Sequence, residues 1–95
     1  MDNCLLYILT NKRNGIMHVG IARDLKQILE TKQSPQEGRF AQKYQCNQLV
    51  WYKQFPCTED ALDWEFMFKW WSRLQKMSLV ERMNPYREDL SMKFA

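Results

Sequence analysis

Two side chains near the start of the chain can transfer protons. Tyr7 lies in a short apolar run, and His18 is the only histidine in the 95 residues. A phenol and an imidazole can each donate or accept a proton, and the imidazole is the better general base near pH 7. Each also has an ordinary structural interpretation, because Tyr7 suits a packed core and a lone histidine is more often a hydrogen-bonded structural residue.

Basic side chains are concentrated in the first part of the chain. The net charge is +3, and residues 1–57 carry eight Lys and Arg against four Asp and Glu, whereas residues 58–95 carry six against seven. This imbalance is compatible with a partner that bears phosphate groups. It is also common in proteins whose charges are only solvated.

Length and composition restrict the class of protein. The 95 residues, 45% of them hydrophobic, predict one globular domain over 1–95. The longest apolar run, Cys4 to Leu9, is too short for a membrane span or a secretory signal, so we expect a cytoplasmic protein. The three cysteines form no C-x-x-C pair, which argues against a disulfide framework or a structural zinc site.

The proton-transferring residues must be positioned by a small sheet. Residues 4–9 and 16–20 predict two strands joined by a turn at Asn14-Gly15, with Gly20 ending the second strand. Asp24 is predicted to cap a helix that runs to about Lys32. A loop at 34–38, a short helix at 40–44 and a strong strand at 49–55 follow.

The second half of the chain predicts helices. Thr58 is expected to cap a long helix that runs to about Lys76. Ser78 and Glu81 have the spacing of a capping box, which predicts a short last helix that Asn84-Pro85 ends. The order is β-β-α-(α)-β-α-α. Because the first two strands form an antiparallel hairpin, the fold class is α+β, with helices packed on a small sheet.

The long helix carries more apolar surface than one sheet can cover. Glu65, Lys69, Ser72 and Lys76 form one narrow polar stripe at 100° per residue. Most of the remaining circumference is apolar: Trp64, Phe66, Met67, Trp70, Trp71 and Leu74. The excess can be covered by the last helix and Phe94, or it can contact a second copy of the chain.

The sequence resembles the GIY-YIG nuclease superfamily, and most closely its small single-domain branch. The matching segments follow one another in the family order over nearly the whole chain: 5–11 (LLYILTN), 18–25 (HVGIARDL), 38–40 (GRF), 43–44 (KY), 49–52 (LVWY), Glu65 with Lys69, Trp71, Ser72 and Arg73, then Asn84-Pro85 and Asp89-Leu90. The resemblance implies a three-stranded antiparallel sheet flanked by helices.

The resemblance also implies a site that hydrolyses a phosphodiester with one divalent metal ion. Tyr7 matches the tyrosine of the first family motif, which helps to activate the attacking water. Glu65 matches the metal-binding glutamate, whose hard oxygen suits Mg²⁺ or Mn²⁺. Asn84 matches a late family asparagine. The second motif, Tyr-Ile-Gly in the family, is His18-Val19-Gly20 here, so a histidine replaces its tyrosine.

One departure from the family pattern weakens the predicted catalysis. A family arginine lies eight residues after the glycine of the second motif, and this position is Ile28; a family histidine four residues further on is Lys32. Loss of one electrostatic catalytic group typically costs about 10²–10³ in rate. Arg23 or Lys32, about one helical turn away, are possible substitutes.

Three functions follow as hypotheses. The first is a nucleic-acid-binding domain, with DNA more expected than RNA, whose cleavage is weakened or lost. The second is an active endonuclease that depends on Mg²⁺ or Mn²⁺ and uses His18. The third is a homo-oligomeric interaction module. The predicted nucleic-acid-binding residues are all basic: Lys12, Arg13, Arg23, Lys32, Arg39, Lys43, Lys69 and Arg73.

Overall fold

A three-stranded antiparallel sheet forms the centre of the computed structural model, which describes residues 3–11, 17–33 and 48–91. The strands are β1 (Cys4–Thr10), β2 (Met17–Ala22) and β3 (Gln48–Phe55), in the order β2-β1-β3. The predicted α+β fold class is therefore confirmed. The predicted turn at Asn14-Gly15, loop at 34–38 and helix at 40–44 lie outside the described residues.

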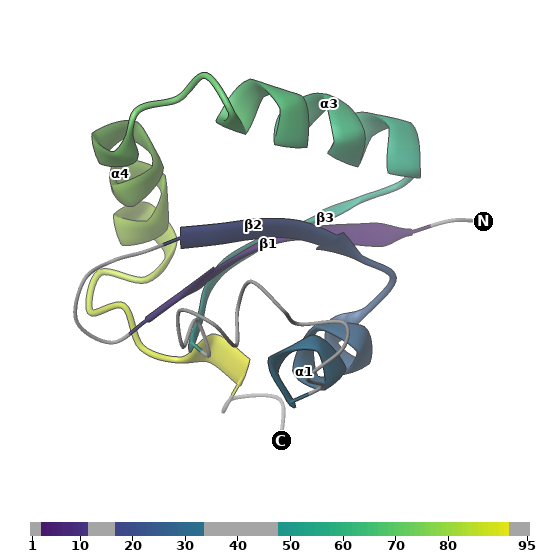
Figure 1. Cartoon of the computed structure of the whole chain (residues 1–95), viewed down its shortest axis with the longest axis horizontal. Helices are drawn as coiled ribbons and strands as arrows, with labels where there is room; N and C mark the ends of the chain where they lie inside the picture. Colours follow the sequence, from purple (N-terminus) through teal and green to yellow (C-terminus); the bar gives the residue numbers. More distant parts are fainter. Residues whose placement is uncertain (1–2, 12–16, 34–47, 92–95) are drawn as a thin grey trace.

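Helices cover both faces of the sheet (Figure 1). Helices α3 (Thr58–Phe68) and α4 (Arg73–Met83) lie on one face, and α1 (Leu25–Gln33) lies on the other. Each residue of the central strand β1 is buried. A strand that is covered on both faces needs apolar side chains at successive positions, which explains the continuous apolar run at residues 4–9.

The face under α3 and α4 holds an aromatic core. Leu6 and Ile8 of β1 pack there with Phe68 of α3. The ring of Phe68 lies 5.7 Å from that of Trp51 and 4.9 Å from that of Trp71, measured between centroids. These contacts account for the apolar side of α3 that faces the sheet.

The opposite face is built around α1. Ile28 of α1 is fully buried and belongs to the same cluster as Tyr7, Leu9 and Leu49. The helix begins as predicted, because the carboxylate of Asp24 accepts a hydrogen bond of 2.9 Å from the backbone N–H of Gln27. Residues of β1 therefore alternate between two separate apolar cores.

Strand β2 continues past Gly20, which corrects the predicted strand end. Gly20 pairs with Tyr7 in the β1–β2 ladder, and the strand ends at Ala22. A Cβ atom built on Gly20 would lie 2.5 Å from the hydroxyl oxygen of Tyr7. The glycine is therefore an interior strand residue that leaves room for the tyrosine ring.

The predicted single helix over 58–76 is wrong, because the chain breaks between α3 and α4. The last turn of α3 tightens into i→i+3 hydrogen bonds, such as the 3.0 Å bond from the Trp70 N–H to the Met67 carbonyl. Ser72 then caps α4 in a capping box with Gln75. The break allows Trp71 to pack on Phe68, which is the physical reason for it.

Two predicted helix caps are also wrong. The residue that precedes α3 is Cys57, which makes no side-chain cap, so Thr58 is the first helical residue. Ser78 lies inside α4 and does not begin a helix. The predicted end of the last helix is confirmed, because α4 ends at Met83 and Asn84 is its C-cap.

A β-bulge interrupts β3 where it pairs with β1. Ile8 pairs with Trp51 but Leu9 pairs with Leu49, so Val50 has no partner residue in β1. The segment after α4 supplies the missing hydrogen bonds. The side chain of Asn84 donates to the carbonyl of Val50, and the carboxylate of Asp89 accepts from the backbone N–H of Leu49 at 3.1 Å.

Part of the excess apolar surface stays exposed. Trp70 is 77% exposed and Leu74 is 79% exposed, and Phe66 and Met67 are also exposed. The last helix therefore does not cover them, and Phe94 lies outside the described residues. Among the helices of the described ranges, none has the length and hydropathy needed to cross a bilayer.

Candidate active site

A pocket beside the edge strand β2 contains the predicted metal-binding glutamate. Its volume is about 340 Å³, and Val19, Glu65, Phe68, Lys69 and Lys76 line it. Glu65 and Lys76 are half-buried, whereas Lys69 is exposed at the rim. Val19 and Phe68 provide the apolar part of the lining, and one glutamate and two lysines provide the rest. We call it the Glu65 pocket.

The break between the helices builds this pocket. If residues 58–76 formed one continuous helix, Lys76 would lie eleven positions after Glu65, about 16 Å further along the helix axis. Side chains that far apart would line the same stripe but not the same pocket. Because α3 ends at Phe68 and α4 begins at Arg73, the chain turns and Lys76 contributes to the pocket beside Glu65.

Tyr7 and His18 lie together on the other face of the sheet. Their ring centroids are 6.0 Å apart and the rings meet edge to face. Tyr7 is buried over Gly20, whereas His18 is half-buried. Burial lowers the pKa of His18 below its ordinary value of 6.5. The imidazole is therefore neutral at pH 7 and can accept a proton.

The candidate residues thus form two groups on opposite sides of β2. Val19 points to the Glu65 pocket, and its neighbour His18 points to the face of Tyr7 and α1, because successive strand residues alternate. In the sheet order β2-β1-β3, β2 is an edge strand.

Ile28, which the resemblance matches to the family arginine, is part of the core. Ile28 is fully buried in the α1 cluster with Tyr7 and Leu49. Arg23, one of its two predicted substitutes, is exposed just before α1. The other, Lys32, is placed in α1 by its backbone.

Asn84 is held by hydrogen bonds within the fold. Its side-chain amide donates to the carbonyl of Val50 at 3.3 Å and to that of Glu88 at 2.7 Å, and its side-chain oxygen accepts from the Glu88 N–H at 3.0 Å. These three contacts describe a structural role. A catalytic role for Asn84 stays a prediction.

The predicted nucleic-acid-binding residues are only partly placed. Lys69 lines the Glu65 pocket, and Arg73 is the first residue of α4. Four others lie outside the described residues: Lys12, Arg13, Arg39 and Lys43. Lys76 was not predicted as a site residue, although its position on the stripe of Glu65 was the signal that could have identified it.

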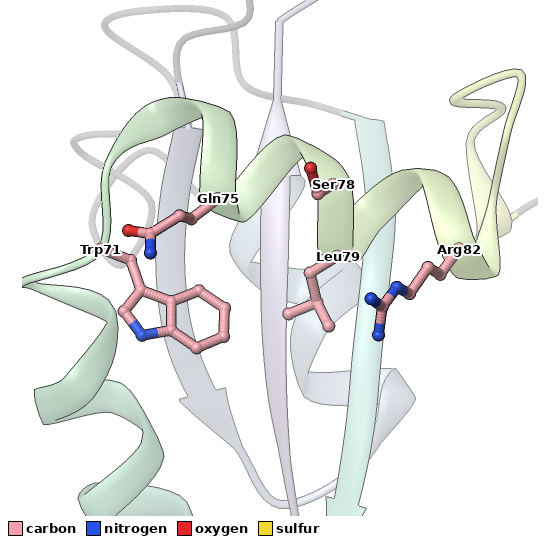
Figure 2. Close-up of a pocket in the computed structure, with 5 residues that line it drawn as sticks. All are labelled: Trp71, Gln75, Ser78, Leu79 and Arg82. Carbon is pink, nitrogen blue, oxygen red and sulfur yellow. The ribbon is translucent and has the colours of Figure 1, made fainter.

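A second pocket lies along α4 (Figure 2). Its volume is about 240 Å³, and Trp71, Gln75, Ser78, Leu79 and Arg82 line it. Trp71, Leu79 and Arg82 lie along one side of α4, in front of the strands. Glu65 does not line this pocket, so it is separate from the Glu65 pocket.

The sheet order and the flanking helices define a small α+β domain. A family model described as the GIY-YIG catalytic domain matches residues 3–78. The chain therefore belongs to the GIY-YIG family, and its function is related to nucleic acid. No curated protein and no solved structure gives a significant match to the chain.

Proposed function

We propose that this GIY-YIG domain binds nucleic acid along the β2 edge and that its phosphodiester cleavage is weakened or lost. The observation that carries the proposal is the burial of Ile28. This residue occupies the family arginine position and is fully enclosed in the α1 core. An aliphatic side chain in a packed core cannot stabilise the negative charge that develops on a transferring phosphoryl group.

The rest of the site retains groups that suit phosphate chemistry. Glu65, Lys69 and Lys76 share one pocket on the α3 side of β2. His18, neutral at pH 7, lies on the other side of the same strand and can accept a proton from water. Tyr7 is buried beside it, so His18 is the more accessible of the two.

Glu65 fits a divalent ion of the Mg²⁺ or Mn²⁺ type. A carboxylate is a hard oxygen ligand, and such ions keep several waters or phosphate oxygens as their other ligands. Within residues 3–11, 17–33 and 48–91, no group of three or more His, Cys, Asp and Glu side chains gathers around one point. We propose Glu65 as the protein ligand, with waters and phosphate oxygens as the other ligands. A bound ion would neutralise charge on the phosphate.

Binding and plasmid nicking test the proposal together. We expect wild type to bind labelled DNA with an affinity that falls steeply with salt, because phosphate contacts release counterions. Nicking of supercoiled plasmid in Mg²⁺ or Mn²⁺ is expected to stay near background. Glu65→Gln is the site variant, and Glu81→Gln, an exposed position on α4, is its matched control.

Two results would contradict this proposal. An affinity that is independent of salt, or absent for both duplex and single-stranded DNA and RNA, would exclude nucleic-acid binding through phosphates. Strong nicking by wild type that Glu65→Gln abolishes and Glu81→Gln preserves would instead establish an active endonuclease. Nicking that persists in both variants indicates a contaminating nuclease and leaves the expectation of weak cleavage in place.

A second candidate function is self-association. Phe66, Trp70 and Leu74 are exposed near the α3–α4 junction, and the ring centroids of Phe66 and Trp70 lie 6.2 Å apart. Exposed surfaces of this kind mark interaction sites. Light scattering over a range of concentrations tests this function. A mass that stays monomeric at high concentration excludes it, and Trp70→Ser should then have no effect.

A further inference from the structure

We propose that Lys76, assisted by Lys69, binds a phosphate group of the nucleic acid next to Glu65 and takes over the charge of the missing family arginine. This inference rests on the proposed nucleic-acid function. It assigns the cation to the α3–α4 side of β2, whereas Arg23 and Lys32, the substitutes expected from the sequence, belong to the α1 side of the molecule.

The composition of the Glu65 pocket favours an anion. The residues that line it include two lysines and one glutamate, so the lining carries a net positive charge. The walls of Val19 and Phe68 reduce contact with water, and charges interact more strongly where water is partly excluded. A phosphodiester group carries one negative charge, so its binding brings the formal charge of the two lysines, Glu65 and the phosphate to zero.

The two lysines have different surroundings. Lys76 is half-buried in the pocket wall and comes from the second turn of α4. Lys69 is exposed, and its ammonium nitrogen lies 6.0 Å from the centroid of the Phe66 ring. Lys76 is therefore the better-positioned phosphate ligand, and Lys69 adds charge at the rim.

A lysine in place of an arginine explains how binding and catalysis can separate. An ammonium group attracts phosphate as a point charge, whereas a guanidinium holds two oxygens in a fixed, planar geometry. Phosphoryl transfer depends strongly on such positioning. A lysine-based pocket therefore keeps the affinity for phosphate and supplies less of the geometry that cleavage requires.

The test is the salt dependence of DNA binding in single-residue variants. Lys76→Met keeps the apolar stem and removes the charge, Lys76→Arg keeps the charge, and Lys69→Met tests the rim. Lys26→Met is the matched control, because Lys26 is exposed on α1, across the sheet. The probe is a fluorescein-labelled DNA duplex followed by fluorescence anisotropy, and urea unfolding verifies that each variant is folded.

We expect Lys76→Met to reduce the steepness with which the logarithm of the association constant falls with log salt by about 0.9, the value for one phosphate contact on duplex DNA. The affinity should fall roughly five- to tenfold near ~0.1 M salt. Lys69→Met should have a smaller effect in the same direction. Lys76→Arg should restore the wild-type slope, and Lys26→Met should retain it.

The possible failures are distinguishable. If wild type binds with a steep salt slope and Lys76→Met retains both slope and affinity, the phosphate site at Lys76 is wrong while nucleic-acid binding stands. If Lys26→Met reduces the steepness of the salt dependence as much as Lys76→Met does, the phosphate contacts are spread over the surface and the pocket is not the site. If wild type does not bind, the proposed function and this inference are both wrong.

Discussion

The side-chain amide nitrogen of Asn84 lies 3.3 Å from the carbonyl oxygen of Val50, and this bond joins the end of α4 to the bulge in β3. A bulged residue leaves backbone groups without ladder partners, and a buried polar group without a partner is costly. Here the side chain of Asn84 donates to the Val50 carbonyl, and the carboxylate of Asp89 accepts from the Leu49 N–H. Asn84, which the family resemblance assigns to the site, therefore also stabilises the fold by joining the end of α4 to β3.

Asn84→Ala should destabilise the protein by about 2–3 kcal/mol, because it leaves several partly buried backbone groups unpaired. Urea unfolding measures this change. Asn84→Asp should retain the bond from the Glu88 N–H and lose both donated bonds, so an intermediate loss is expected. Unchanged stability in Asn84→Ala, accompanied by weaker DNA binding, would instead favour a role in the site.

Gly20→Ala should displace the ring of Tyr7. The added methyl group would lie 2.5 Å from the tyrosine oxygen and 2.7 Å from the carbon that bears it. Relief of such overlap in a packed core typically costs about 1–3 kcal/mol. A double-mutant cycle with Tyr7→Leu measures the coupling, since the shorter side chain makes room for the methyl group. If the losses of stability in Gly20→Ala and Tyr7→Leu simply add in the double variant, the tyrosine ring does not hinder the methyl group and the prediction is wrong.

Ile28→Arg tests whether restoration of the family residue restores cleavage. Because Ile28 is fully buried, we expect the arginine to destabilise the fold by more than about 3 kcal/mol and to give no nicking. Ile28→Val, which removes one methyl group, should cost only about 0.5–1.5 kcal/mol. A folded Ile28→Arg variant that nicks plasmid would show that the scaffold tolerates the family site.

The stability of the protein should depend on His18 at mildly acidic pH. Burial lowers the pKa of His18 in the folded state below its ordinary value of 6.5. Between these two values the unfolded chain binds more protons, so the free energy of unfolding rises with pH and falls as pH drops below about 6.5. His18→Gln should remove this part of the pH dependence. Parallel profiles for both proteins would contradict it.

The three strands and the first helix were predictable because each is specified by a local sequence pattern. The family was predictable because its matching segments extend over nearly the whole chain. The apolar run at residues 4–9 and the cap at Asp24 specify their elements with little help from distant residues. The bulge in β3 was not predictable, because it depends on bonds to Asn84 and Asp89, which follow in the chain after two helices.

The break between α3 and α4 could not be predicted from a helix-breaking residue, because residues 69–72 contain no glycine or proline. Ser72 with Gln75 and Ser78 with Glu81 both have the spacing of a capping box, and only the second pair was predicted to form one. The contact of Trp71 with Phe68 favours the earlier one, Ser72. The polar stripe correctly grouped Glu65 with Lys76, although the proximity of these side chains arises from the turn and not from a continuous helix.

The length of the α3–α4 junction consequently carries functional information that residue identity alone does not. One residue inserted between Phe68 and Arg73 would change the path of the turn and therefore the position of Lys76 relative to Glu65. A relative could therefore keep both lysines and the glutamate in an alignment and still lack the pocket. A change of junction length could therefore remove the proposed phosphate site without replacing any of its residues.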